Sequence, residues 1–230
     1  EPEPVRFTLR KLTINGKELW KILSIGVPAG LQGMVFSLAN VCIQSTINSF
    51  GSDAVAGSAA ALNYEFFAYF IVNAFAQTTV TFTSQNYGAG EYDRCRKIFR
   101  INMAFSMVFC GLLSAVFVLG RSFFLGLYTT DASVLEYATT RLVIATTLEL
   151  LTSIYEISGG AMRGLGHSLQ PALITVFGSC VLRLIWISTA CVAVHEFWVL
   201  IIIYPISWVV TGIIMIISYL RLRKKMLIKN

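Results

Sequence analysis

Residues 197–220 read FWVLIIIYPISWVVTGIIMIISYL and contain no charged side chain. A helix of this length crosses the hydrocarbon core of a bilayer, which is about 30 Å thick and needs roughly 20 apolar residues. Soluble domains are about 25% charged, whereas this chain of 230 residues is 13% charged and 56% hydrophobic, with a mean hydropathy of +0.69. The composition excludes a soluble enzyme, a secreted disulfide scaffold and a disordered chain, and it indicates a polytopic membrane protein.

Further stretches of similar length and apolarity precede this one along the chain. The expected spans are residues 22–50, 66–87, 101–128, 134–160, 169–194 and 197–220. Breaker-rich turns at 51–53 and 129–131 separate neighbouring spans, and Pro28 with Gly30 predicts a kink in the first. We therefore expect an all-α membrane protein, a bundle of six transmembrane helices.

The lysines and arginines predict the orientation of these spans. They cluster before the first span, between the second and third, at Arg163 between the fourth and fifth, and after the sixth, whereas the other loops contain Arg121 and little else that is basic. Cytoplasmic loops carry such an excess. We expect a cell-membrane protein with both termini cytoplasmic, and because the net charge of +6 lies in these loops, no nucleic-acid partner is expected.

The cysteines and histidines do not have the spacing of a metal or redox site. The five cysteines are odd in number and lack a Cys-x-x-Cys pair, and His167 and His195 have no partner at ligand spacing. No nucleotide-binding loop or activated serine is visible either. We expect no enzyme activity, no metal and no cofactor, and the start at Glu1-Pro2-Glu3-Pro4, without a signal peptide, suggests a piece of a longer polypeptide.

Polar side chains form stripes within two adjacent spans. Helical periodicity places Asn40 and Gln44 on one face of the first span, and Asn73 and Gln77 on one face of the second. Such amides either join helices by hydrogen bonds or line a water-filled cavity that accepts organic molecules. Both interpretations are open at this point.

Charged side chains inside the spans are costly unless they are paired. Glu149 and Glu156 lie in the fourth span, and Arg183 lies in the fifth at a depth comparable to that of Glu149. We expect a Glu149–Arg183 ion pair, with Glu156 on the same face and closer to the cytoplasm. The pair is either structural or contains a protonatable carboxylate that changes partner during transport. Glu65 is expected at the interface, at the outer end of the second span.

Polar stripes, intramembrane charges and interrupted helices are typical of secondary transporters rather than channels. Four strings, in this order along the chain, resemble the multidrug and toxic compound extrusion (MATE) family. They are GVPAGLQ at 26–32, SQNYGAGEYDR at 84–94, GAMRGLG at 160–166 and YPISW at 204–208. The resemblance covers nearly the whole chain.

The resemblance implies twelve helices in two pseudo-symmetric lobes, of which this chain is the C-terminal one, helices seven to twelve. Residues 1–18 would be a cytoplasmic inter-lobe linker and residues 19–230 the six-helix lobe. The family exports cationic or amphipathic organic compounds by proton or sodium antiport, through a cavity between the lobes. The implied partners are the missing N-terminal lobe, small organic cations as substrate and membrane lipid.

The first span departs from one branch of the family, which carries an ion-binding glutamate near the position of Phe36. Residues 26–51 contain no carboxylate. The aspartate that another branch of the family uses would lie outside this chain. The choice between H⁺ and Na⁺ as the coupling ion is therefore open. Two alternatives remain. A lipid-linked oligosaccharide flippase would carry more cations along its cavity, and a non-transporting membrane subunit would lack cavity carboxylates.

Overall fold

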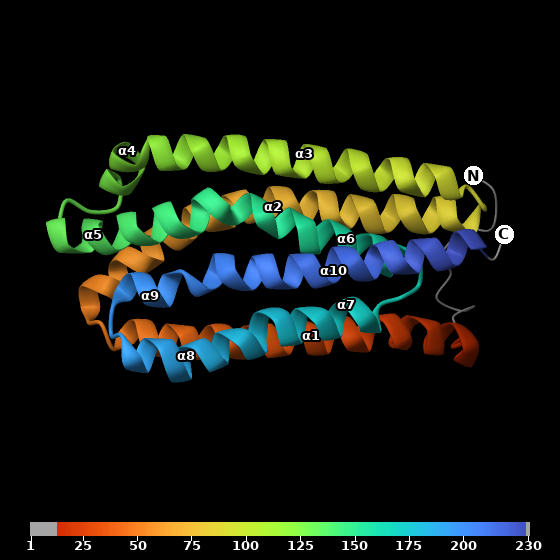
Figure 1. Cartoon of the computed structure of the whole chain (residues 1–230), viewed down its shortest axis with the longest axis horizontal. Helices are drawn as coiled ribbons and strands as arrows, with labels where there is room; N and C mark the ends of the chain where they lie inside the picture. The colour runs from red at the N-terminus through yellow and green to blue at the C-terminus, as the bar shows by residue number, and fades with distance from the viewer. Residues whose placement is uncertain (1–12, 229–230) are drawn as a thin grey trace.

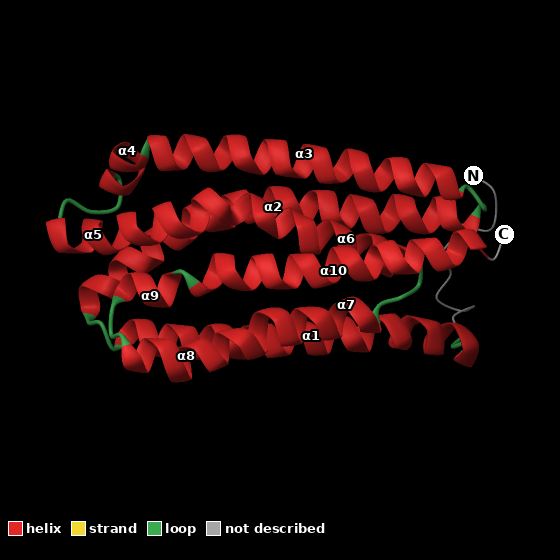
Figure 2. Ribbon diagram, viewed as in Figure 1, coloured by secondary structure: helices red, strands yellow, loops and turns green. Residues whose placement is uncertain are grey.

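The structure is a computed structural model that describes residues 13–228. Within this range, six helical segments are long and apolar enough to cross a membrane. They lie side by side along the long axis of the molecule, with the chain reversing at either end (Figure 1). Every regular element in the described range is helical (Figure 2). The expected fold class is therefore confirmed, whereas residues 1–12 of the expected linker lie outside the described residues.

The first three spans are continuous helices, and the last three are interrupted. The first three are α1 (Gly16–Asn48), α2 (Ser52–Gly88) and α3 (Tyr92–Leu119), and the short α4 (Arg121–Gly126) follows them. The fourth span consists of α5 (Ala132–Arg141), a π-helical segment (Leu142–Thr146), a 3₁₀ turn (Glu149–Leu151) and α6 (Thr152–Gly164). The fifth consists of α7 (Leu169–Thr175), a second π-helical segment (Val176–Val181) and α8 (Leu182–Ala193), and the sixth of α9 (Phe197–Ile201) and α10 (Ile203–Ile228).

The start of α2 differs from the sequence expectation. The helix begins at Ser52, directly after Gly51, whose φ of 95° suits glycine, rather than at residue 66. Residues 52–65 are rich in alanine and other small side chains, which favour helix and allow close packing against neighbouring helices. The extension places Glu65 in the middle of a long helix and buries it, so the expected interfacial position of Glu65 is wrong.

Pro28 lies inside α1, which continues as a helix on both sides of it. A proline has no backbone N–H, so the carbonyl four residues earlier loses its helical partner. That carbonyl belongs to Ser24, and the hydroxyl of Ser168, just before α7, donates a hydrogen bond to it at 3.1 Å. The start of the fifth span thus satisfies a backbone group that the proline leaves free in the first.

Glycines bring α2 and α6 into close contact. A Cβ atom at Gly160 would lie 2.9 Å from the carbonyl oxygen of Ala76, and one at Gly164 would lie 2.7 Å from the Cβ of Thr83. Small residues at helix crossings allow this approach between membrane helices. The close packing fixes α6 against α2 and so sets the position of the segment that carries Glu149.

The helix α3 forms one edge of the bundle (Figure 1). Its inner face packs against α2 and α6, and the Ser106 and Ser153 hydroxyls lie 2.8 Å apart across this contact. Its outer face exposes large apolar side chains, among them Val108 and Leu112. The outer face is therefore suited to contact with lipid, whereas the inner face is packed within the bundle.

Outside the spans, Asp131 caps the start of α5. Its carboxylate accepts hydrogen bonds from the Ser133 hydroxyl and from the backbone N–H groups of Ser133 and Val134. These hydrogen bonds hold the pKa of Asp131 below its ordinary value, and the bond from the Ser133 hydroxyl has the largest effect. The cap therefore stabilises the helix start at neutral pH and is lost as the pH falls through the lowered pKa.

Candidate functional site

A cavity of about 290 Å³ lies between α1, α2, the fourth span, α8 and α10. Its wall is mainly aromatic and aliphatic, with two carboxyl groups, two guanidinium groups and two amides among the apolar side chains. The lining residues are Phe36, Asn40, Ile43, Gln44, Ile47, Leu62, Glu65, Phe66, Tyr69, Arg141, Glu149, Tyr155, Arg183, Tyr204 and Trp208. Such a mixture of an apolar wall and a few polar groups is typical of sites for organic ligands.

Glu65 and Arg141 form a buried bidentate ion pair on the cavity wall. The Arg141 Nε and Nη2 atoms donate to the two carboxylate oxygens of Glu65 at 2.6 and 2.9 Å. The Nη1 atom donates to the Ser58 hydroxyl at 2.7 Å, and the guanidinium carbon lies 5.3 Å from the ring centroid of Tyr204. Two parallel bonds make this a strong, geometrically defined pair that joins α2 to α5.

Arg183 has a different environment. It is fully buried, and its Nε atom donates to the Ser207 hydroxyl at 3.1 Å. Its guanidinium carbon lies 4.5 Å from the ring centroid of Tyr204 and 5.4 Å from that of Phe36. Within residues 13–228 no carboxylate lies within ion-pair distance of it. Aromatic rings and a hydroxyl, rather than an acid, therefore stabilise this cation.

Glu149 lines the same cavity and is 4% exposed. In the described part of the chain, its carboxyl group has no ion pair within 4.0 Å and no hydrogen-bond partner. The expected Glu149–Arg183 ion pair is therefore wrong. The π-helical segment and the 3₁₀ turn near Glu149 change the direction that a regular helix would give its side chain. Arg183, for its part, contacts Ser207 and the rings of Phe36 and Tyr204 instead of a carboxylate.

The predicted amide residues separate into two groups. Asn40 and Gln44 line the cavity, whereas Asn73 and Gln77 do not. Because α1 and α2 form an antiparallel hairpin, Asn73 lies about 18 Å farther from the turn than Asn40 at 1.5 Å per residue. The two amide stripes therefore lie at different depths and do not face each other across one cavity.

Glu156 belongs to a second polar cluster, outside the cavity lining. Its carboxylate accepts a hydrogen bond from the Tyr69 hydroxyl at 3.4 Å and lies 3.7 Å from Arg163 Nη2. The hydroxyl of Ser153, between Glu149 and Glu156 in the sequence, contacts that of Ser106 on α3. Glu149 lines the cavity and Glu156 does not, so the expected common face of the two glutamates is wrong, because the fourth span is not one regular helix.

The sequence prediction missed several groups of the site, among them Arg141, Ser58 and Tyr204. Arg141 was identifiable, because it is a charged residue inside the apolar stretch 134–160, where a partner is required. Ser58 lay outside the expected second span. Nothing in the sequence distinguishes Tyr204 from the other tyrosines as the ring that contacts both arginines.

Six membrane-length helices around a cavity with buried charges define one lobe of a polytopic membrane protein, of the kind found in secondary transporters. The MatE family model matches residues 28–187. Because this match covers more than half of the chain, the chain belongs to the MatE family, and the resemblance noted in the sequence is confirmed.

Two curated relatives are named for drug resistance or export. The chain is 27% identical over 177 residues to the probable multidrug resistance protein YoeA of Bacillus subtilis, covering 76% of this chain and 38% of the relative. It is 23% identical over 177 residues to the multidrug export protein MepA of Staphylococcus aureus, covering 76% and 39%. The chain thus spans well under half the length of these relatives.

Solved structures show the same fold. The Vibrio cholerae MATE transporter VcmN in the bent form matches with a TM-score of 0.82 and 22% identity, over 92% of this chain and 48% of that one. A MATE structure in the straight conformation matches with a TM-score of 0.84 and 20% identity, over 97% and 50%. This lobe therefore corresponds to about half of a MATE chain.

Proposed function

We propose that the chain is one six-helix half of a secondary transporter that exports cationic or amphipathic organic compounds, drugs or toxins, in exchange for protons or sodium ions. The names of the relatives support export of drugs. The observation that carries the proposal is Glu149, a buried carboxyl group that faces a cavity and has no cation within ion-pair distance in the described chain.

A buried carboxylate without a partner is costly, and a proton, a sodium ion or an organic cation would each neutralise it. Only one of these can occupy the carboxyl group at a time, so an entering ion would release a bound organic cation. This competition is the minimal chemistry of antiport. The amides of Asn40 and Gln44 would supply hydrogen bonds to a substrate.

The aromatic wall supports an organic rather than a purely inorganic ligand. Phe36, Tyr69 and Trp208 line the cavity, and aromatic faces attract organic cations and pack against apolar groups. Asn73, Gln77 and Glu156 lie outside this cavity. In the proposal they line the path between the cavity and the end of the bundle where α1 begins and α10 ends.

The proposal places a second lobe in a longer polypeptide. The chain corresponds to about half of the solved MATE structures, and α1 is the least buried span, with Asn40 and Gln44 exposed beside the cavity. The second lobe would cover α1 and complete the cavity. Because the basic loops lie at the end of the bundle where α1 begins and α10 ends (Figure 1), we propose that this end is cytoplasmic.

The test is transport by the full polypeptide in proteoliposomes, with ethidium as the organic cation and a proton or a sodium gradient imposed separately. Glu149→Gln should reduce the rate of gradient-driven export about tenfold or more, which corresponds to at least about 1.4 kcal/mol in the barrier to transport. Glu136→Gln removes an exposed carboxylate of α5 and is the matched control, which should transport normally. Normal export by folded Glu149→Gln would contradict the proposal.

One observation favours the flippase alternative, namely that Arg183 has no carboxylate partner in the described residues and could bind an anionic headgroup. The same proteoliposomes separate the two functions. If the protein translocates lipid-linked pyrophosphates rather than ethidium, and Arg183→Gln abolishes that translocation while Glu149→Gln does not, the flippase is correct.

A further inference from the structure

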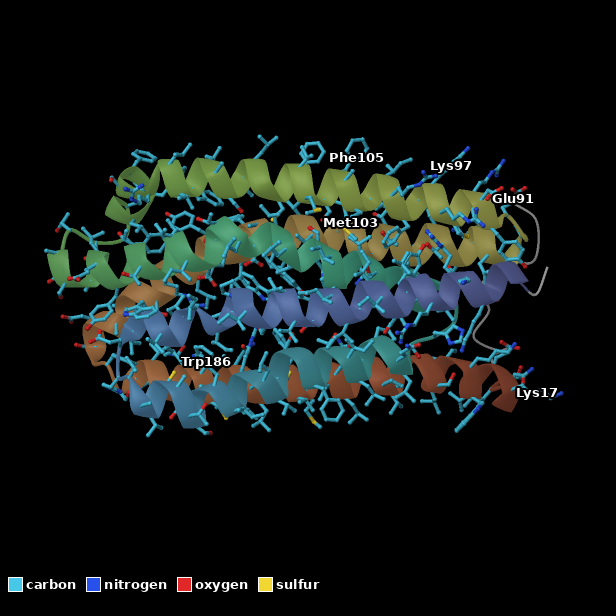
Figure 3. The ribbon with its side chains drawn as sticks, in the orientation of Figure 1. Lys17, Glu91, Lys97, Met103, Phe105 and Trp186 are labelled. Atoms are coloured by element: carbon cyan, nitrogen blue, oxygen red, sulfur yellow. The ribbon has the colours of Figure 1, made fainter. Side chains whose placement is uncertain are left out.

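The outer face of α3 carries a groove that takes no part in the proposed transport site. The groove has a volume of about 350 Å³ and is lined by Lys97, Arg100, Ile101, Ala104 and Phe105. These five residues recur at three- and four-residue intervals, so they form one stripe along the helix. Figure 3 shows Lys97 and Phe105 projecting from the outer side of α3, away from the other helices.

The two cations of the groove differ from their basic neighbours. Arg94 lies 3.7 Å from Glu91 and Arg96 lies 3.2 Å from Asp93, each within an ion pair along the helix. Lys97 and Arg100 are exposed, and in the part of the chain that the structure describes neither forms an ion pair. Like charges three residues apart on a helix repel each other, and an anion bound between them would relieve that repulsion.

The position of the groove along α3 indicates what kind of anion it fits. Lys97 lies about 8 Å and Arg100 about 12 Å from the first residue of the helix, Tyr92, at 1.5 Å per residue. The next residues along the stripe are apolar, and Ile101 and Phe105 are 52% and 51% exposed. The cations therefore lie where the polar end of the span meets its apolar part, as at the headgroup level of a bilayer.

We propose that this groove binds an anionic phospholipid, with its phosphate between Lys97 and Arg100 and an acyl chain along Ile101, Ala104 and Phe105. A free phosphate or nucleotide would use the cations and leave the apolar part of the stripe without a ligand. Lipids with anionic headgroups bind to basic residues next to membrane spans, each residue contributing about 1 kcal/mol. Charge and apolarity in one groove thus match the two ends of a single lipid.

The arrangement of the bundle separates this groove from the proposed second lobe. The helix α3 lies at one edge of the bundle and α1 at the opposite edge (Figure 1). A lobe that packs against α1 to complete the cavity leaves the outer face of α3 free for lipid. The proposal is independent of the transported compound, because lipid binding can be measured without transport.

The test compares lipids retained by the full polypeptide in nanodiscs of phosphatidylglycerol mixed with phosphatidylcholine, measured by native mass spectrometry. The wild type should retain phosphatidylglycerol in preference to phosphatidylcholine. Lys97→Gln/Arg100→Gln should weaken this preference by up to about 30-fold. This is the change in affinity expected when two basic residues at the membrane surface are lost. Arg94→Gln/Arg96→Gln removes the same charge from paired positions outside the groove and should leave the preference nearly unchanged.

Three results would overturn the proposal. Equal losses in both double variants would mean that the basic end of the bundle attracts anionic lipid without a site. Equal retention of the two lipids by the wild type would mean that headgroup charge does not matter. Displacement of phosphatidylglycerol by millimolar inorganic phosphate would identify the groove as a site for a free anion.

Discussion

The cavity contains two acid–base combinations of the same residue types, and they behave differently. Glu65 and Arg141 meet through two hydrogen bonds of 2.6 and 2.9 Å. Glu149 and Arg183 line the same cavity, and no ion pair forms between them. All four side chains are buried, and each combination consists of one glutamate and one arginine. The groups that surround each arginine therefore decide whether it forms an ion pair with the glutamate.

The immediate surroundings of the two arginines explain this difference. Arg141 lies opposite a carboxylate on α2, with Ser58 two turns earlier on the same helix to accept the remaining bond. The guanidinium of Arg183 lies against the rings of Tyr204 and Phe36 and donates to Ser207. The first combination is a completed link between helices, and the second leaves Glu149 available to a ligand.

The largest expected effect is on the completed pair. Arg141→Met should lower the free energy of unfolding by about 3–5 kcal/mol, because it leaves Glu65 buried without a partner. Thermal or denaturant unfolding of the full polypeptide in detergent measures the change. Arg121→Met, at the exposed first residue of α4, is the control and should change stability by less than about 0.5 kcal/mol. Similar small effects of both substitutions would show that the pair is not structural.

The next effect concerns the close approach that brings Arg141 to Glu65. A Cβ atom at Gly57 would lie 2.5 Å from the carbonyl oxygen of Val134 and 2.8 Å from the backbone nitrogen of Ala138. Gly57→Ala should therefore push α5 away from α2 and destabilise the protein by about 1–3 kcal/mol.

The control for that substitution is Gly111→Ala on α3, where the nearest atom to a new Cβ is the Leu150 Cδ2 atom at 3.7 Å. This change should be neutral or slightly stabilising, because alanine favours helix more than glycine does. The same unfolding measurement serves for both variants. A neutral Gly57→Ala would mean that α5 can shift while the ion pair persists.

A smaller effect is expected for the aromatic support of Arg183. Phe36→Leu removes one of the two rings and should cost about 1 kcal/mol of cation–π stabilisation beyond the packing loss. Phe66→Leu is the matched control, since Phe66 lines the same cavity and contacts neither arginine through its ring. Equal losses in unfolding free energy for the two variants would show that the ring of Phe36 does not stabilise the cation.

Much of the fold was predictable from the sequence, because membrane spans are long and apolar and their loops contain breakers and charges. The bounds of the second span were not, since hydropathy alone does not identify the alanine-rich residues 52–65 as the first turns of a long helix. That difference moved Glu65 from an expected interface to the centre of the bundle.

The candidate site was predictable only in part. Asn40, Gln44, Glu149 and Arg183 do line one cavity, because polar groups inside a span must face protein or water. Their pairing was not predictable, because a periodicity of 100° per residue fails where the fourth span changes to π and 3₁₀ geometry. Such changes depend on packing against neighbouring helices, which a single sequence does not specify.

The most direct test of the difference between the two acid–base combinations is a pair of double-mutant cycles on unfolding free energy. One cycle uses Glu65→Gln and Arg141→Met, and the other uses Glu149→Gln and Arg183→Met. We expect a coupling energy of about 2–3 kcal/mol for the first cycle and less than about 0.5 kcal/mol for the second. A coupling for Glu149 and Arg183 equal to or larger than that for Glu65 and Arg141 would contradict the account.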